Sequence, residues 1–161
     1  MNCLATLTSC IEDDGRFYSY AKKVQGETLV DASVKIRAAD AADPTSYRIL
    51  RVGLWLHLSA PPPATGGRTA ITPVAEALGG QLAVLAQNQK WAALLEESES
   101  ALPANRFALD LHRHSWQALV GLGGTHDRAR EAVTIEVRSL LARFPQVADL
   151  TFGDGTPLAD P

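Results

Sequence analysis

Apolar residues recur at helical spacing along most of the chain, and few segments alternate with the period of a β-strand. Short breaks separate the later apolar segments, and short connections place neighbouring helices antiparallel. The sequence therefore predicts an all-α fold, a compact array of about six to seven helices packed as antiparallel helical hairpins. The expected helices cover residues 3–13, 29–42, 44–59, 73–87, 88–101, 105–122 and 126–143.

Helix boundaries follow from capping residues and helix breakers. Gly15 is expected to end the first helix, and the polar stretch "KKVQGET" is assigned no definite structure. Asp43 and Pro44 fit the N-cap and the first position of a helix. The segment "SAPPPATGGRTAITP" cannot be helical, and it predicts a long loop within one domain. Gly123 or Gly124 supplies a left-handed turn after residue 122.

The helix over 44–59 is apolar almost all round, which predicts burial or contact with a partner. By contrast, the acidic segment "EESES" of helix 88–101 is expected to face water. Residues 1–42 are predicted to form N-terminal helices, and the sequence leaves open whether they belong to the core or partly form a linker. Residues 43–161 form the main domain, which makes one compact unit with the preceding helices if these belong to the core.

Composition places the chain among soluble globular proteins, because 46% of residues are hydrophobic, 20% are charged and the net charge is -3. This slightly acidic balance disfavours nucleic acid as a partner. No signal peptide is evident, and the longest apolar run, "VGLWLHL", is too short to span a bilayer, so we expect no membrane insertion and a cytoplasmic location. Cys3 and Cys10 are interpreted as packed small side chains, since they lie two helical turns apart.

The segment "NRFALDLHRHSWQAL" gathers Asp110, His112, His114 and Ser115 within six positions. On a helix His112 and His114 point nearly opposite ways, so they cannot chelate one ion, and Ser115 diverges from His114. Only pairs of Asp110 with His114 or with Arg113 remain at helix-surface spacing. The segment therefore predicts packing, and we assign it no catalytic residue, metal ligand or cofactor.

Three other motifs carry weak signals for chemistry. His57 lies in the most apolar helix, where a satisfied buried histidine is favoured over a pH-sensitive contact. The segment "ATGGRT" lacks the spacing of a phosphate-binding loop. "FGDGT" resembles part of a calcium loop, but no acidic closing residue follows, and a tight turn at Asp154 explains it better.

A resemblance to a known family rests on several segments in a fixed order. "DPTSYRILRVGLWLHLSAPPP" and "GRTAITP" come first, followed by "RFALDLHRHSWQALVGLG", "AREAVTIEVRSLLARFPQV" and "LTFGDGTPLADP". Over residues 43–161 the chain resembles the middle region of the TssA family, also called ImpA or VasJ, of bacterial type VI secretion systems. The most specific positions are Phe107, Leu109, Asp110 and Leu111, and in the final loop Phe152, Asp154, Gly155, Thr156, Pro157, Ala159 and Asp160.

The resemblance implies a protein that is not an enzyme. Members of the family are multidomain assembly proteins that associate with the baseplate and the growing sheath and tube, and a separate C-terminal domain builds most of their oligomers. Because the usual N-terminal and C-terminal domains are not recognisable here, we expect an excised middle domain. Its place in the family suggests a spacer that self-associates as a homodimer or larger oligomer.

Aromatic anchors in apolar patches drive association, so the contact surface is expected at the helix around Trp55 or at the face bearing Trp116. Two alternatives remain from the residues alone. One is a generic helical-hairpin adaptor that binds a partner peptide or helix in a groove. The other is a hydrolase or metal-binding domain that depends on a histidine such as His114.

Overall fold

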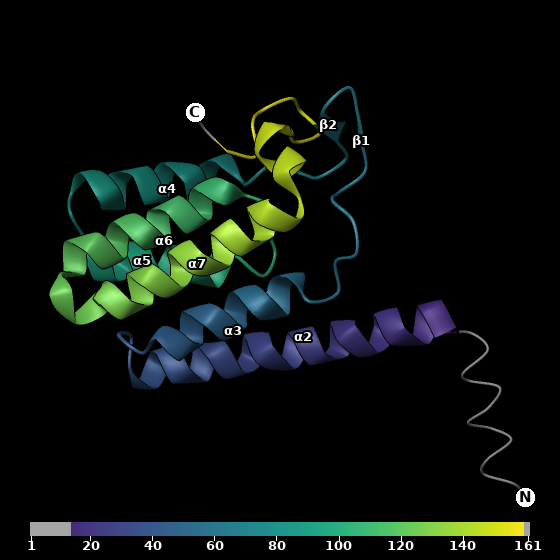
Figure 1. Ribbon diagram of the computed structural model, residues 1–161. Coiled ribbons are helices and arrows are strands. Elements are labelled where there is room, and N and C mark those ends of the chain that lie inside the picture. Colours follow the sequence, from purple (N-terminus) through teal and green to yellow (C-terminus); the bar gives the residue numbers. More distant parts are fainter. Residues whose placement is uncertain (1–13, 160–161) are drawn as a thin grey trace, which may run out of the picture.

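Helices pack side by side in the computed structural model, which describes residues 14–159, with side chains from residue 21 onward. The six helices of the described residues form an antiparallel hairpin of two beside a group of four, named here the four-helix group, and the arrangement can be followed in Figure 1. The bounds are α2 Asp14–Ala39, α3 Pro44–Trp55, α4 Glu76–Gln87, α5 Trp91–Ala101, α6 Leu109–Leu122 and α7 Asp127–Arg143, with 3-10 turns at Gly124–His126 and Pro145–Asp149. The predicted all-α array of helical hairpins is confirmed. The helix expected over residues 3–13, with Cys3 and Cys10, lies outside the described residues.

The first described helix is longer than predicted. α2 begins by Asp14 and runs through Gly15 and the "KKVQGET" segment, so the expected break and the start at residue 29 are wrong. Within the "KKVQGET" segment, Gly26 faces Gly53 of α3. A Cβ atom on Gly26 would lie 2.5 Å from the Gly53 carbonyl oxygen. Glycine lowers helix propensity, but at Gly26 the missing side chain lets the backbones of α2 and α3 approach closely.

α3 begins as the sequence predicts and ends earlier. The Asp43 carboxylate accepts a hydrogen bond from Thr45 N at 2.8 Å, with Pro44 at the first helical position. The helix stops at Trp55 rather than at residue 59, because the chain tightens into a turn in which Leu58 N donates to Trp55 O at 3.1 Å. Tyr47, Leu50 and Leu54 are buried, since α3 packs between α2 and α7.

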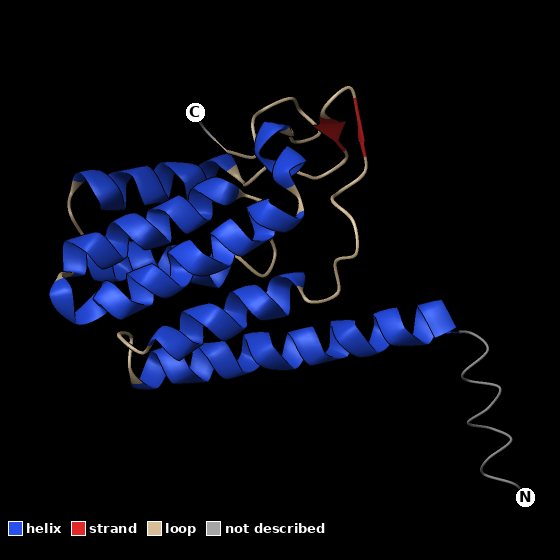
Figure 2. Ribbon diagram, viewed as in Figure 1, coloured by secondary structure: helices blue, strands red, loops and turns tan. Residues whose placement is uncertain are grey.

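The proline-rich loop folds back onto the end of the chain. Two short strands, β1 Ala64–Thr65 and β2 Arg68–Thr69, form a hairpin, drawn in red in Figure 2. Thr69 N donates to Thr151 O at 3.0 Å, and Thr151 N donates to Gly67 O at 2.9 Å. The loop and the C-terminal segment therefore hold each other in place.

The four-helix group departs from the prediction at its acidic segment. Glu96 is exposed, but Ser98 and Glu99 are buried, so the expectation that all of "EESES" faces water is wrong. This segment of α5 lies against α3 and α6, and its buried polar groups have hydrogen-bond partners inside the protein.

The C-terminal end of α6 lies where the sequence predicts it. Gly123 has φ +90° and ends the helix. Between residues 14 and 159, no helix combines the length and the hydropathy needed to cross a bilayer.

Candidate functional site

The polar residues of α6 separate onto different sides of the helix, as their spacing predicts. His114 is half-buried, beside the ion pair in which Arg113 Nη2 lies 3.0 Å from Asp110 Oδ1. Burial and the Arg113 charge lower the pKa of His114, and the Asp110 carboxylate acts in the opposite direction. His112 points into the core, where its ring centroid lies 5.2 Å from that of Trp55. The two histidines therefore lie in different environments, His114 near the surface and His112 in the core.

Ser115 has a structural environment rather than a catalytic one. It is buried, and its hydroxyl lies 3.0 Å from the hydroxyl of Ser98 and donates to Leu111 O at 3.1 Å. The hydrogen-bond partners of Ser115 thus come from α5 and from its own helix. Among the described side chains, no three metal-binding groups gather at one place.

A buried ion pair lies near His112, and the sequence analysis missed it. Arg51 of α3 approaches Glu99 of α5, with Nη2 to Oε1 at 2.7 Å and Nη1 to Oε2 at 3.3 Å, and both side chains are fully buried. Burial and the Arg51 charge lower the pKa of His112 well below its ordinary value, and the Arg106 backbone acts weakly the other way. Neither ring nitrogen has a well-formed hydrogen bond to a described residue. The one available signal was a charged residue, Arg51, on the buried stripe of α3.

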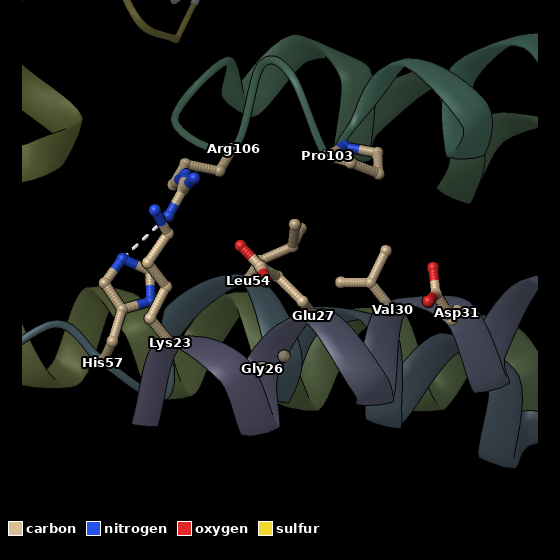
Figure 3. Close-up of a pocket in the computed structure, with 10 residues that line it drawn as sticks. Lys23, Gly26, Glu27, Val30, Asp31, Leu54, His57, Pro103 and Arg106 are labelled. Carbon is tan, nitrogen blue, oxygen red and sulfur yellow. Dashed lines mark hydrogen bonds between the residues drawn. The ribbon is translucent and has the colours of Figure 1, made fainter. Parts of the chain in front are cut away.

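His57 was predicted as a satisfied buried histidine, and it is partly exposed. Its Nε2 atom lies 2.8 Å from Arg106 Nη1 at the edge of a cavity, as Figure 3 shows. Burial, the Arg106 charge and the Lys23 charge lower the pKa of His57, and Glu27 acts in the opposite direction. No local pattern indicated the contact of His57 with Arg106, because the two residues lie 49 positions apart.

The C-terminal loop is built around a tight turn, as "FGDGT" predicts. Asp154 Oδ1 accepts hydrogen bonds from the Thr156 backbone N at 2.9 Å and from the Thr156 hydroxyl at 2.7 Å. These bonds lower the pKa of Asp154. Gly155 takes φ +94°, and Phe152 next to the turn is buried in the core. Asp154 therefore shapes the loop, and Phe152 anchors it.

The two tryptophans considered as contact anchors have different surroundings. Trp55 is 4% exposed, and its indole Nε1 donates to Arg106 O at 3.1 Å, so it belongs to the core. Trp116 is 43% exposed. It lines a groove of about 280 Å³, named here the α6–α7 groove, whose lining consists of Leu109, His112, Arg113, Trp116, Val133, Thr134, Val137 and Arg138. Of the two tryptophans, only Trp116 presents a large apolar surface to a partner.

A comparison of the sequence with models of known protein families gives a match, which covers helices α3 to α7. A family model described as "Type VI secretion, EvfE, EvfF, ImpA, BimE, VC_A0119, VasJ" matches residues 20–161. The chain belongs to this ImpA/VasJ family. The match also covers most of α2, which precedes the 43–161 span of the sequence resemblance. No curated protein shows a significant match to the chain.

The positions that carried the resemblance to the ImpA/VasJ family lie in two packed regions. Phe107 packs against the core just before α6, and Phe152 is buried near the end of the described chain. The two regions meet where Leu109 N donates to Leu158 O at 2.8 Å. The segments that carried the resemblance thus join one end of the four-helix group to the C-terminal loop. In this chain they contribute to packing.

Proposed function

We propose that this chain is a non-enzymatic structural module of a type VI secretion protein, acting in the cytoplasm to support assembly of the baseplate and of the contractile sheath and tube. Membership of the ImpA/VasJ family supports this assignment. Residues 43–161 would form the middle domain, and the packing of α2 along α3 supports including the preceding helix in it. Nucleic acid is not an expected partner, given a net charge of -3.

The exposed side chain of Trp116 in the α6–α7 groove is the observation that supports a contact surface there. An indole that is 43% exposed leaves a large apolar area in water, and Val120, one turn further along α6, is equally exposed. Removing such area from water is favourable, and tryptophan is enriched among residues that dominate binding energy. We infer that the chain self-associates through this face, as a homodimer or a larger oligomer.

Size-exclusion chromatography with light scattering tests this inference at high micromolar concentration. We expect the mass of the wild-type chain to rise with concentration, and Trp116→Ser to remain a monomer. Val84→Ser is the matched control, because Val84 is 55% exposed on α4, outside the groove. A wild-type chain that stays strictly monomeric, or a Val84→Ser variant that dissociates as fully as Trp116→Ser, would overturn the inference.

The concave shape of the α6–α7 groove favours one second candidate, an adaptor that binds a helix of another secretion component. Arg113 and Arg138 are exposed at the rim of the groove, so they suit a partner helix with carboxylates beside its apolar residues. A monomeric chain whose tryptophan fluorescence changes with a purified baseplate or sheath protein, while that of Trp116→Ser does not, would support this candidate. No change with any of these components would exclude it.

A further inference from the structure

A cavity of about 200 Å³ lies where the α2–α3 hairpin meets the connection between α5 and α6. Figure 3 shows its walls: Lys23 and Glu27 come from α2, Leu54 and His57 from α3 and the turn after it, and Arg106 from the α5–α6 connection. The volume exceeds the roughly 30 Å³ that one water molecule occupies in the liquid. The cavity can therefore hold a small chemical group, and it shares no residue with the α6–α7 groove.

One end of this cavity is lined by hydrogen-bond donors. Arg106 Nη1 lies 2.8 Å from His57 Nε2, and a guanidinium can only donate, so the ring nitrogen accepts and the imidazole is neutral. Figure 3 shows the Lys23 side chain extending from α2 toward the same end. The charge of Lys23 also acts on the His57 ring, lowering its pKa. The ammonium and the guanidinium together provide several N–H groups in one small region.

These two cations have no counter-ion among the side chains that the structure describes. Neither Lys23 nor Arg106 has a carboxylate oxygen within the 4.0 Å that defines an ion pair, whereas Arg37, Arg51, Arg113 and Arg130 each have one. Two like charges near one cavity repel each other, and that repulsion is relieved when an anion lies between them. Among the described side chains, neither cation is thus neutralised by an ion pair.

Carboxylates further along α2 limit the size of such an anion. Glu27 lies one helical turn from Lys23, and Asp31 lies one turn further, and both line the cavity. Their negative charges repel a second anionic group, and the charge of Glu27 also acts on the His57 ring. Such an arrangement suits one oxyanion and disfavours a polyanion such as nucleic acid.

We propose that Lys23 and Arg106 bind a single oxyanion, a carboxylate or a phosphate, beside His57 in this cavity. The planar guanidinium offers a pair of parallel N–H donors to the two oxygens of either group, and the lysine adds a mobile point charge. The carboxylate could belong to an acidic side chain or a chain terminus of a partner, and the phosphate could be free in solution. This site lies beyond the proposed structural function and does not depend on it.

The experiment is a titration of the ¹⁵N-labelled chain, followed by two-dimensional NMR, with sodium acetate and with sodium phosphate, each at an ionic strength held constant with sodium chloride. We expect saturable shifts of the amide signals of Lys23, His57 and Arg106 with one of the two anions. The bound anion should also raise the pKa of His57, because negative charge next to the ring favours the imidazolium. Saturation by acetate alone assigns the site to carboxylates, and saturation by phosphate alone assigns it to phosphate.

Three variants make the titration decisive. Arg106→Gln should weaken binding roughly tenfold or more, the loss expected for charge-assisted hydrogen bonds. Glu27→Gln should tighten binding, because it removes the repelling carboxylate, and Lys35→Gln on an exposed part of α2 should leave it unchanged. The Trp55 indole N–H signal checks the fold of Arg106→Gln, since that bond uses the Arg106 backbone carbonyl. Shifts that do not saturate, or equal affinity in Arg106→Gln and Lys35→Gln, would overturn the proposal.

Discussion

Replacement of Glu99 by glutamine should destabilise the fold more than any change at an exposed residue. In the wild-type chain the Arg51 guanidinium and the Glu99 carboxylate make two contacts, at 2.7 and 3.3 Å, and neither side chain is exposed. Glutamine has nearly the same shape but carries no charge. The variant therefore leaves the positive charge of Arg51 in the core, where water cannot solvate it.

The expected cost is about 3–5 kcal/mol of the free energy of unfolding, the range for removing one partner of a buried ion pair. A domain is typically stable by about 5–15 kcal/mol, so the loss would be a large share of the total. Replacing both residues together, Arg51→Met with Glu99→Leu, removes both charges and keeps apolar volume. We expect this double variant to be about as stable as the wild type or more stable, because neither charge then needs to be desolvated.

Urea unfolding followed by circular dichroism at 222 nm measures these differences through the midpoint and slope of the transition. The partly exposed pair of Arg113 with Asp110 supplies the control, and Asp110→Asn should change stability by less than about 1 kcal/mol. The reasoning fails if Glu99→Gln costs no more than Asp110→Asn. It also fails if the double variant is as unstable as Glu99→Gln, since the loss would then come from packing rather than from an unpaired charge.

Two further predictions concern the backbone and the titration of the core. Gly53→Ala should cost roughly 1–3 kcal/mol or more, because its Cβ would lie 2.6 Å from the Gly26 carbonyl oxygen, whereas Gly80→Ala on α4 meets open space and should gain about 0.5–1 kcal/mol. Below about pH 6.5 the unfolded chain protonates His112 and the folded chain does not, because burial lowers the folded pKa. As the pH is lowered below this value, the free energy of unfolding should therefore decrease more steeply in the wild type than in His112→Leu. The two slopes should differ by about 1.4 kcal/mol per pH unit.

Thermal and urea unfolding measure the stability of the glycine variants. The same measurements repeated across pH 4.5–7.5 test the prediction for His112. Equal effects of Gly53→Ala and Gly80→Ala on stability would show that the close approach of α2 and α3 does not limit the side chain at Gly53. Parallel pH profiles for the wild type and His112→Leu would show that His112 titrates in the folded state much as it does in the unfolded state.

Local patterns were sufficient for much of the fold and for one feature of the site. Asp43 and Pro44 marked the start of α3, Gly123 marked the end of α6, and the 100° step per residue separated His112 from His114. Each of these inferences depends on residues a few positions apart. The structure confirms them because backbone geometry and capping act over one or two helical turns.

The errors share a different cause. α2 continues through Gly15 and Gly26, and Ser98 and Glu99 of "EESES" are buried, although glycine usually indicates a break and acidic segments an exposed face. Contacts with α3 account for Gly26 and for Glu99: Gly53 accommodates Gly26, and Arg51 pairs with Glu99. The preference of a residue for a break or for an exposed position contributes less free energy than a well-formed tertiary contact. A prediction from local preference is therefore wrong where such a contact forms.

The sequence alone thus determined the helical class, the ends of the last four helices and the family to which the chain belongs. The starts expected at residues 73, 88 and 105 were wrong, because α4, α5 and α6 begin at Glu76, Trp91 and Leu109. Only the tertiary structure decided that Trp55 is buried while Trp116 is exposed, and that His57 meets Arg106 from 49 positions away. The reason is physical. Helix periodicity fixes which residues share a face, but the neighbouring helices decide which face is covered and which charges meet, and those neighbours lie far along the chain.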